Sequence, residues 1–225
     1  MAKIKKEEEI RQQNMAEAVS KAETFFKENG KIIYGCVLGV LIVALCVLAY
    51  NRFILQPQKQ QATDQLAQAE RWFQAGEYEL ALTGDDNDPG LEEIIDQYGA
   101  KAGQAVYMYA GVAKLHTGAF EEAIAYLKKY KGEDPILLSR AQGCIGDAYV
   151  ELEDLDKAIN YYEKAAATVD NALAAAYLLK AGIVAEANGK PELALSFYQT
   201  IKDQWANAPE AMEIDKYITR IQFAE

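Results

Sequence analysis

The chain has 225 residues, of which 51% are hydrophobic and 25% charged, and its formal net charge is −11. This length allows a folded core, and the low glycine and proline content, 15 and 5 residues, favours helices. The negative charge is concentrated in residues 52–225, with 16 Lys/Arg against 28 Asp/Glu, so the chain repels phosphate backbones and we expect no nucleic-acid binding.

The first segment, residues 1–31, is a charged leader with seven Lys/Arg and six Asp/Glu. Its composition predicts a helix. Because its net charge is almost nil, a solvated helix is a simpler interpretation than one lying on a membrane surface.

The second segment, residues 32–51, contains no charged residue, and its nineteen residues from Ile32 to Tyr50 read as one apolar helix. At about 1.5 Å per residue, such a helix crosses the roughly 30 Å hydrocarbon core of a bilayer. A buried core helix would have a polar face, and a cleaved signal peptide usually has a shorter apolar run. We therefore predict an uncleaved membrane anchor with these residues: Lys31, Ile32, Tyr34, Gly35, Gly39, Tyr50 and Arg52.

The orientation of this anchor depends on a small charge difference. Three lysines, Lys21, Lys27 and Lys31, lie close to it on the N-terminal side, against Arg52 and Lys59 on the other. The positive-inside rule then places the N-terminus in the cytoplasm and the larger C-terminal part outside it.

An internal repeat follows the anchor. Three ten-residue segments align between residues 118 and 198, and their sixth-position alanines are 35 and 36 residues apart. A glycine lies twelve residues before each alanine. The period and the small residues at close helix contacts resemble the tetratricopeptide repeat, a pair of antiparallel helices. Three copies in phase argue against coincidental amphipathic helices. The glycines and alanines are Gly111, Gly146, Gly182, Ala123, Ala158 and Ala194.

Segments on either side complete the predicted array. Residues 52–103 hold a degenerate first repeat with Trp72 and an acidic insertion in which Asp88 would cap an extra helix beginning at Pro89. Residues 104–206 hold the three repeats, and residues 207–225 a capping helix. The prediction is thus an all-α protein: a single transmembrane helix, then a tetratricopeptide solenoid with a C-terminal cap. The stripe of the cap is Ala211, Ile214, Ile218 and Ile221.

The sequence offers no catalytic, cofactor or metal constellation. His116 is the only histidine, and no cysteine or carboxylate pattern supplies it with partners. The run DDNDPG at 85–90 has a proline where a calcium loop needs a ligand. We therefore predict a non-catalytic protein that needs no cofactor.

The first helix of each tetratricopeptide pair lines the groove in which such arrays hold partners. These positions mix apolar and acidic residues, without the lysines and asparagines that clamp a peptide carboxylate, so the groove would suit a hydrophobic segment or a partner helix. The chain's own terminal helix could equally fill it. The predicted groove residues are Met108, Val112, Leu115, His116, Asp147, Val150, Glu151, Leu179, Ile183 and Glu186.

The start of the anchor is the most specific motif. FFKENGK at 25–31, leading into a span with Gly35 and Gly39, resembles the YfgM-type ancillary subunit of the bacterial Sec translocon. The resemblance implies an inner-membrane protein with one span, a cytoplasmic N-terminus and a periplasmic repeat domain. It also implies two protein partners, the SecYEG translocon and a membrane-anchored periplasmic chaperone of the PpiD type. The acidic insertion and the tyrosine-rich repeats depart from the family, so partner preferences can differ.

Two other function classes remain open. A membrane-anchored import receptor or assembly scaffold would expose the same repeats to the cytosol. An enzyme would need a pocket of titrating groups that the sequence does not reveal.

Overall fold

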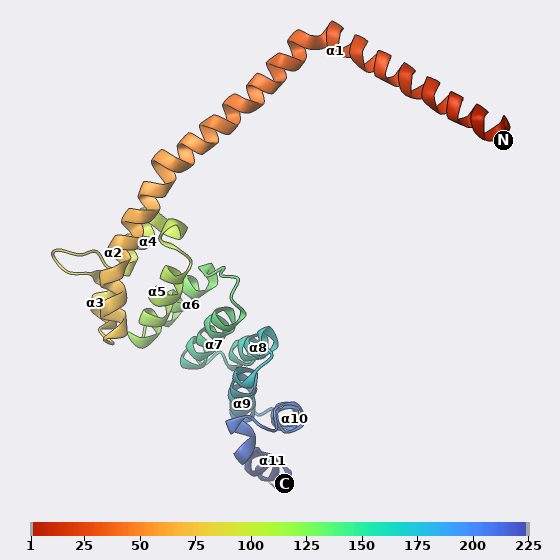
Figure 1. Ribbon diagram of the computed structural model, residues 1–225. Helices are drawn as coiled ribbons and strands as arrows, with labels where there is room; N and C mark the ends of the chain where they lie inside the picture. Colours follow the sequence, from red (N-terminus) through yellow and green to blue (C-terminus); the bar gives the residue numbers. More distant parts are fainter. Residues whose placement is uncertain (1, 224–225) are drawn as a thin grey trace. The chain divides into compact units, whose positions relative to one another are not determined.

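The computed structural model describes the backbone of residues 2–223 and the side chains of these residues other than 2–10, 12, 13, 18 and 22. The described residues form helices and connecting turns with no β-strand, apart from one isolated bridge between Gly84 and Pro89. The predicted all-α class is therefore confirmed. The chain divides into two compact units between Pro57 and Gln58 (Figure 1).

The N-terminal unit consists of helix α1, Ala2–Tyr50, and a π-helical segment η1, Asn51–Leu55. Helix α2, Gln56–Gln74, follows directly and carries Pro57 in its first turn. Proline has no N–H to donate, and its ring would clash with the carbonyl group four residues earlier. The wider π turn, in which the Gln56 N–H donates to the Asn51 carbonyl, accommodates the proline without ending the helix.

The C-terminal unit begins with α2, the short helix α3, Tyr78–Thr83, and helix α4, Leu91–Tyr98. Apolar side chains of these helices form one core cluster, together with residues along helix α5. A 3₁₀ turn η2, Gly99–Ala102, leads on to α5. The largest buried side chains in this cluster are Leu66, Trp72, Leu82, Leu91 and Ile94.

The acidic insertion between α3 and α4 corrects one prediction. Helix α4 does not begin at Pro89 with Asp88 as its cap, because Gly90 is the N-cap and Pro89 pairs with Gly84. The Asp85 carboxylate instead accepts hydrogen bonds from the N–H groups of Asn87 and Asp88, both at 2.8 Å. These hydrogen bonds stabilise a turn within the loop, and α4 begins at Leu91, two residues later than predicted.

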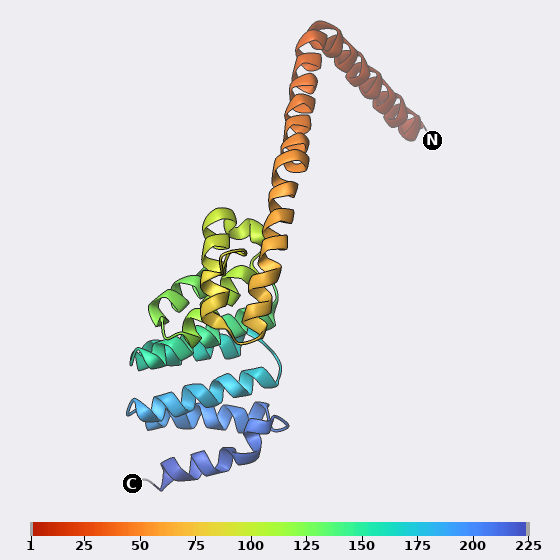
Figure 2. The same cartoon turned by 90° about the vertical axis from the view of Figure 1, so that its left-hand side faces the viewer.

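Three helix pairs follow, in which each helix packs against the next along the chain (Figure 2). The second helix of each pair starts after a tight turn with one residue at positive φ: Gly118, Glu153 or Gly189. Glycine adopts this conformation freely, whereas Glu153 adopts it at a steric cost. The pairs are α5, Ala105–His116, with α6, Phe120–Lys129; α7, Pro135–Glu151, with α8, Leu155–Thr168; and α9, Ala172–Ala187, with α10, Pro191–Gln204.

Each pair is closed by a glycine of the first helix facing a large side chain of the second. A Cβ added at Gly111 would lie 2.5 Å from Leu127, one at Gly146 would lie 2.7 Å from Tyr162, and one at Gly182 would lie 2.2 Å from Tyr198. These distances leave no room for a methyl group. The repeat spacing recognised in the sequence therefore encodes a specific contact between the two helices of a pair.

The C-terminal segment forms a 3₁₀ turn η3, Pro209–Glu213, and helix α11, Ile214–Gln222. Ile214 and Ile218 are buried against the core of α8–α10, and Ile221 is half-buried there. Ala211, predicted as part of the helical stripe, lies in the 3₁₀ turn instead. The regular helix is therefore shorter than predicted, although its apolar face packs against the last pair.

Candidate partner-binding surface

The predicted groove residues of α5 serve mainly the protein's own packing. Met108, Val112 and Leu115 are half-buried and pack against the core cluster that α6 and α7 form. His116 is exposed, and its ring stacks on that of Tyr78 in α3, with centroids 4.1 Å apart and planes 3° apart. The structure therefore leaves this part of the predicted groove with little free apolar surface.

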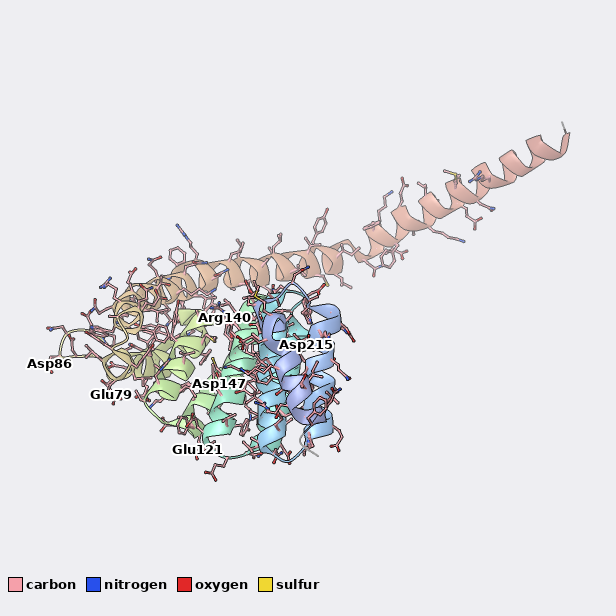
Figure 3. All side chains as sticks on the ribbon, turned by 90° about the horizontal axis from the view of Figure 1, so that it is seen from below. Glu79, Asp86, Glu121, Arg140, Asp147 and Asp215 are labelled. Carbon is pink, nitrogen blue, oxygen red and sulfur yellow. The ribbon has the colours of Figure 1, made fainter. Side chains whose placement is uncertain are left out.

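Asp147 of α7 links three helices. Its Oδ1 accepts a hydrogen bond from the Tyr162 hydroxyl of α8 at 2.6 Å and another from the Lys180 ammonium of α9 at 2.7 Å. Figure 3 shows it within the stack, whereas Asp86 extends outward from the α3–α4 loop. Asp147 thus connects its own helix pair to the next one through Lys180.

Glu186 of α9 plays the corresponding part in the last pair. Its Oε1 accepts from the Tyr198 hydroxyl at 2.6 Å, and Arg220 of α11 donates to both carboxylate oxygens, at 2.6 and 3.1 Å. Such a two-pronged guanidinium contact is the strongest geometry for an ion pair. The chain's own terminal helix therefore engages the predicted groove at this end.

The surroundings of Tyr162 and Tyr198 oppose deprotonation of their hydroxyl groups. Burial, the charge of Asp147 and the hydrogen bond to it raise the pKa of Tyr162 well above its ordinary value. Burial and the hydrogen bond to Glu186 raise the pKa of Tyr198 in the same way. Each hydroxyl is therefore fixed as a donor to a carboxylate at neutral pH.

The remaining predicted residues lie at or near the surface. Val150 and Leu179 are half-buried and pack against the core of α8–α10. Glu151 is exposed, and Ile183 leaves 44% of its surface open, an unusual exposure for a large apolar residue of this unit. Of the ten predicted residues, Ile183, Glu151 and His116 are the ones with exposed side chains.

A cleft of about 600 Å³ lies beside Glu186, between the end of α9, the start of α10 and α11. Pro191, Leu195 and Ile221 give it an apolar wall, while Glu186 and Arg220 form a polar side. The sequence did not indicate this cleft, because it depends on where α11 is placed.

The predicted anchor residues lie on α1 and η1, in the N-terminal unit. Ile32, Tyr34 and Tyr50 are between 55% and 78% exposed, and Lys31 and Arg52 are exposed too. Nothing lies within 4 Å of a Cβ built at Gly35 or Gly39. One helix of the described residues is long and apolar enough to cross a membrane, as judged by length and composition.

Lys180 and Arg220 were not predicted, although a sequence signal for them exists. Each lies 33 or 34 residues after the carboxylate that it pairs with, which is close to one repeat period. The pair of Asp156 and Lys190 has the same spacing, with an oxygen–nitrogen distance of 2.6 Å. In these three contacts an acidic residue is followed about one repeat later by its basic partner, which lies in the next helix pair or, for Arg220, in α11.

Comparison with known proteins supports the interpretation of the repeats. Residues 145–209 match the family model for the tetratricopeptide repeat. The matched region runs from the second half of α7 to the start of η3 and contains the contacts of Asp147 and the hydrogen bond between Tyr198 and Glu186, whereas Arg220 lies beyond it. A search of curated proteins gave no match. Among the described residues, no group of three or more His, Cys, Asp and Glu side chains is arranged to hold a metal ion.

Proposed function

We propose that this chain is a single-pass membrane protein whose repeat domain binds other proteins beside the Sec translocon, without catalysing a reaction. Tetratricopeptide repeats imply a role in protein–protein interaction, and the match over residues 145–209 is the observation that carries this role. The exposed acidic and apolar positions of the first helices, Glu151 and Ile183, are its candidate contact points.

The membrane anchor is supported by solvation energetics. Large apolar side chains of residues 32–50 are exposed along the helix, including Val40, Val43 and Leu48, each more than 60% exposed. At about 25 cal/mol per Å² of apolar surface, leaving so many side chains in water is costly. A bilayer removes that cost, and the uncharged run has the required length.

The Sec assignment rests on the motif at the start of the anchor. FFKENGK at 25–31 supports a place for the chain at the exit side of SecYEG, next to a PpiD-type chaperone. There the repeat domain would contact emerging secreted or outer-membrane proteins in the periplasm of a bacterium.

A labelling experiment tests the orientation. Native Cys144 is a poor reporter, because burial raises the pKa of its thiol to about 11 and lowers its reactivity. The three native cysteines are therefore replaced by alanine, and single cysteines are introduced as Met212→Cys, which is 83% exposed in the wild type, or as Glu17→Cys in the leader.

In spheroplasts, a membrane-impermeant maleimide should label the Met212→Cys protein at once and the Glu17→Cys protein only after permeabilisation. The reverse pattern would favour the import-receptor or scaffold alternative. Lysine and arginine differ by one residue between the two sides of the span, three against two, so the charge bias is small.

Partner capture tests the Sec assignment itself. A photo-crosslinking residue at Ile183 should trap translocon subunits or nascent chains in native membranes, whereas the same residue at Gln199, an exposed position of α10, should trap fewer. Purification of the full chain in mild detergent should also recover SecYEG. If neither experiment recovers a Sec component, the assignment fails, and the protein-binding role of the repeats would remain to be matched to another partner.

A further inference from the structure

Helices α6, α7 and α8 together carry a cluster of residues that the predicted groove does not include. The rings of Tyr149 and Tyr161 stack, with centroids 5.5 Å apart. Three lysines approach these rings: Lys128 lies 5.7 Å from both centroids, Lys157 lies 5.2 Å from Tyr149, and Lys164 lies 4.8 Å from Tyr161. We call these five residues the lysine–tyrosine cluster.

The lysine–tyrosine cluster has an excess of positive charge in an acidic unit. Residues 58–225 contain 15 Lys/Arg against 28 Asp/Glu. Most described ion pairs of this unit use other cations, such as Lys114, Lys180 and Arg220. Within the cluster only Lys157 has a carboxylate partner, Asp154, among the described residues. Lys128 and Lys164 are thus held by ring faces and left available to a foreign anion.

The ring pair explains how three like charges can be kept together. The negative face of an aromatic ring attracts an ammonium group, and this attraction offsets part of the repulsion between the lysines. Lys128 also donates a hydrogen bond to the Tyr149 hydroxyl, at 3.3 Å. These contacts restrain the long side chains before any ligand arrives and so reduce the entropy cost of binding.

We propose that the lysine–tyrosine cluster is a docking surface for an acidic segment of a partner protein. Charge complementarity is the reason: the cluster offers two ammonium groups without carboxylate partners beside a third, and glutamate or aspartate side chains can reach these groups along a flexible segment. This surface differs from the predicted groove, and its existence does not depend on the Sec assignment.

An anionic membrane is the less favourable occupant. Binding to a bilayer surface is usually strengthened by apolar side chains that insert between the lipids. The exposed large apolar residues of this unit include Ile136, Leu137, Ile183, Met212 and Phe223, and none of the large apolar side chains of α6 or α8 is exposed in that way. The cluster therefore has charge but no apolar side chain to insert between lipids.

The test measures the binding of a fluorescein-labelled ten-residue polyglutamate peptide to the full chain in an uncharged detergent, by fluorescence anisotropy. Binding is expected at low salt and should weaken as added salt screens the charges. The variant Lys128→Gln/Lys157→Gln/Lys164→Gln should bind about tenfold more weakly, which corresponds to roughly 1.4 kcal/mol.

A second triple variant, Lys59→Gln/Lys101→Gln/Lys216→Gln, changes the net charge equally at exposed sites elsewhere and should bind like the wild type. An equal loss in both variants, or no binding by the wild type, overturns the proposal.

A further arm offers phosphatidylglycerol vesicles to the full chain in phosphatidylcholine nanodiscs. Vesicle binding that only the cluster variant loses would assign the surface to lipid instead. If the peptide does not bind but Ile183 still crosslinks to Sec components, the docking proposal is wrong and the Sec assignment stands.

Discussion

The first helix pair and the two later pairs solve the same packing problem with different side chains. In α5–α6, Gly111 meets Leu127, a contact that is purely apolar. In α7–α8 and α9–α10 the glycine contacts a tyrosine, and the hydroxyl of this tyrosine donates a hydrogen bond to a carboxylate, Asp147 or Glu186. The later pairs thereby combine core packing with links to the next element, and both glycine–tyrosine contacts lie in the region that matches the family model for the tetratricopeptide repeat.

The residue opposite the glycine can therefore have two roles: it fills the space between the helices, and as a tyrosine it also donates a hydrogen bond. Leucine and tyrosine both fill the space above the glycine, but only tyrosine also orients a carboxylate of the first helix. The carboxylate then binds a cation one period further along the chain, which fixes the stacking of successive pairs.

The largest expected effect comes from emptying the tyrosine position. Tyr198 is completely buried, so Tyr198→Ala should lower the free energy of unfolding by about 4 kcal/mol through the lost burial and the cavity left behind. Urea unfolding of the full chain in mild detergent, followed by tryptophan fluorescence, measures the change. Gln199→Ala, at the adjacent exposed position, is the control and should change little. A small loss for Tyr198→Ala would mean that the ring does not hold the pair together.

The next effect comes from filling the glycine position. Gly182→Ala places a methyl group 2.2 Å from the Tyr198 ring, and this overpacking should cost about 2 kcal/mol despite alanine's better helix propensity. The same unfolding experiment measures it. In a Tyr198→Ala background the added methyl group has space, so Gly182→Ala should there be neutral or stabilising. Additive costs in the double variant would contradict the contact.

Removing only the hydroxyl of a tyrosine tests its hydrogen bond to the carboxylate. Tyr198→Phe keeps the ring and deletes the hydrogen bond to Glu186, which should cost about 1.5 kcal/mol. At Leu127 no such bond exists, so Leu127→Met, which nearly conserves volume, should cost less.

The pKa values of the tyrosines add a pH dependence. Because the pKa values of Tyr162 and Tyr198 are raised in the folded protein, their contribution to stability is complete below the ordinary phenol pKa of about 10 and falls as pH rises beyond it. Unfolding curves between neutral and alkaline pH should show this decline. The double variant Tyr162→Phe/Tyr198→Phe should show a shallower one, and an unchanged slope would contradict the assignment.

The smallest effect concerns the turn inside α7–α8. Glu153 has a φ of +58°, where the other two pairs have glycine. Glu153→Gly should therefore stabilise the protein by about 1 kcal/mol, because glycine meets no steric penalty in this conformation. The midpoint of thermal unfolding is the measurement, with Arg140→Gly, at an exposed position in the interior of α7, expected to shift it downward.

Much of the repeat architecture could be predicted because its signals are local. The helix pairs, their glycines and their turns follow from composition and from a period of 35 or 36 residues. Predictions failed where the outcome depends on short-range hydrogen bonds that compete with a helix, as at Asp85, or where a proline sets a 3₁₀ turn, as at Pro209. The groove was harder still, since the packing of Met108, Val112 and Leu115 depends on neighbouring helices.

The amino-acid sequence was enough to identify an apolar run of membrane-spanning length and an array of helix pairs, because the run is a continuous uncharged segment and the array repeats every 35 or 36 residues. Only the tertiary structure decided which side chains stay free. In the folded protein, Asp147 binds Lys180 of the next pair, and Glu186 binds Arg220 of α11, which therefore lies at the end of the predicted groove. Lys128 and Lys164 have no carboxylate partner among the described residues. Most of these outcomes depend on contacts between different helices, and such contacts form only when the helices pack.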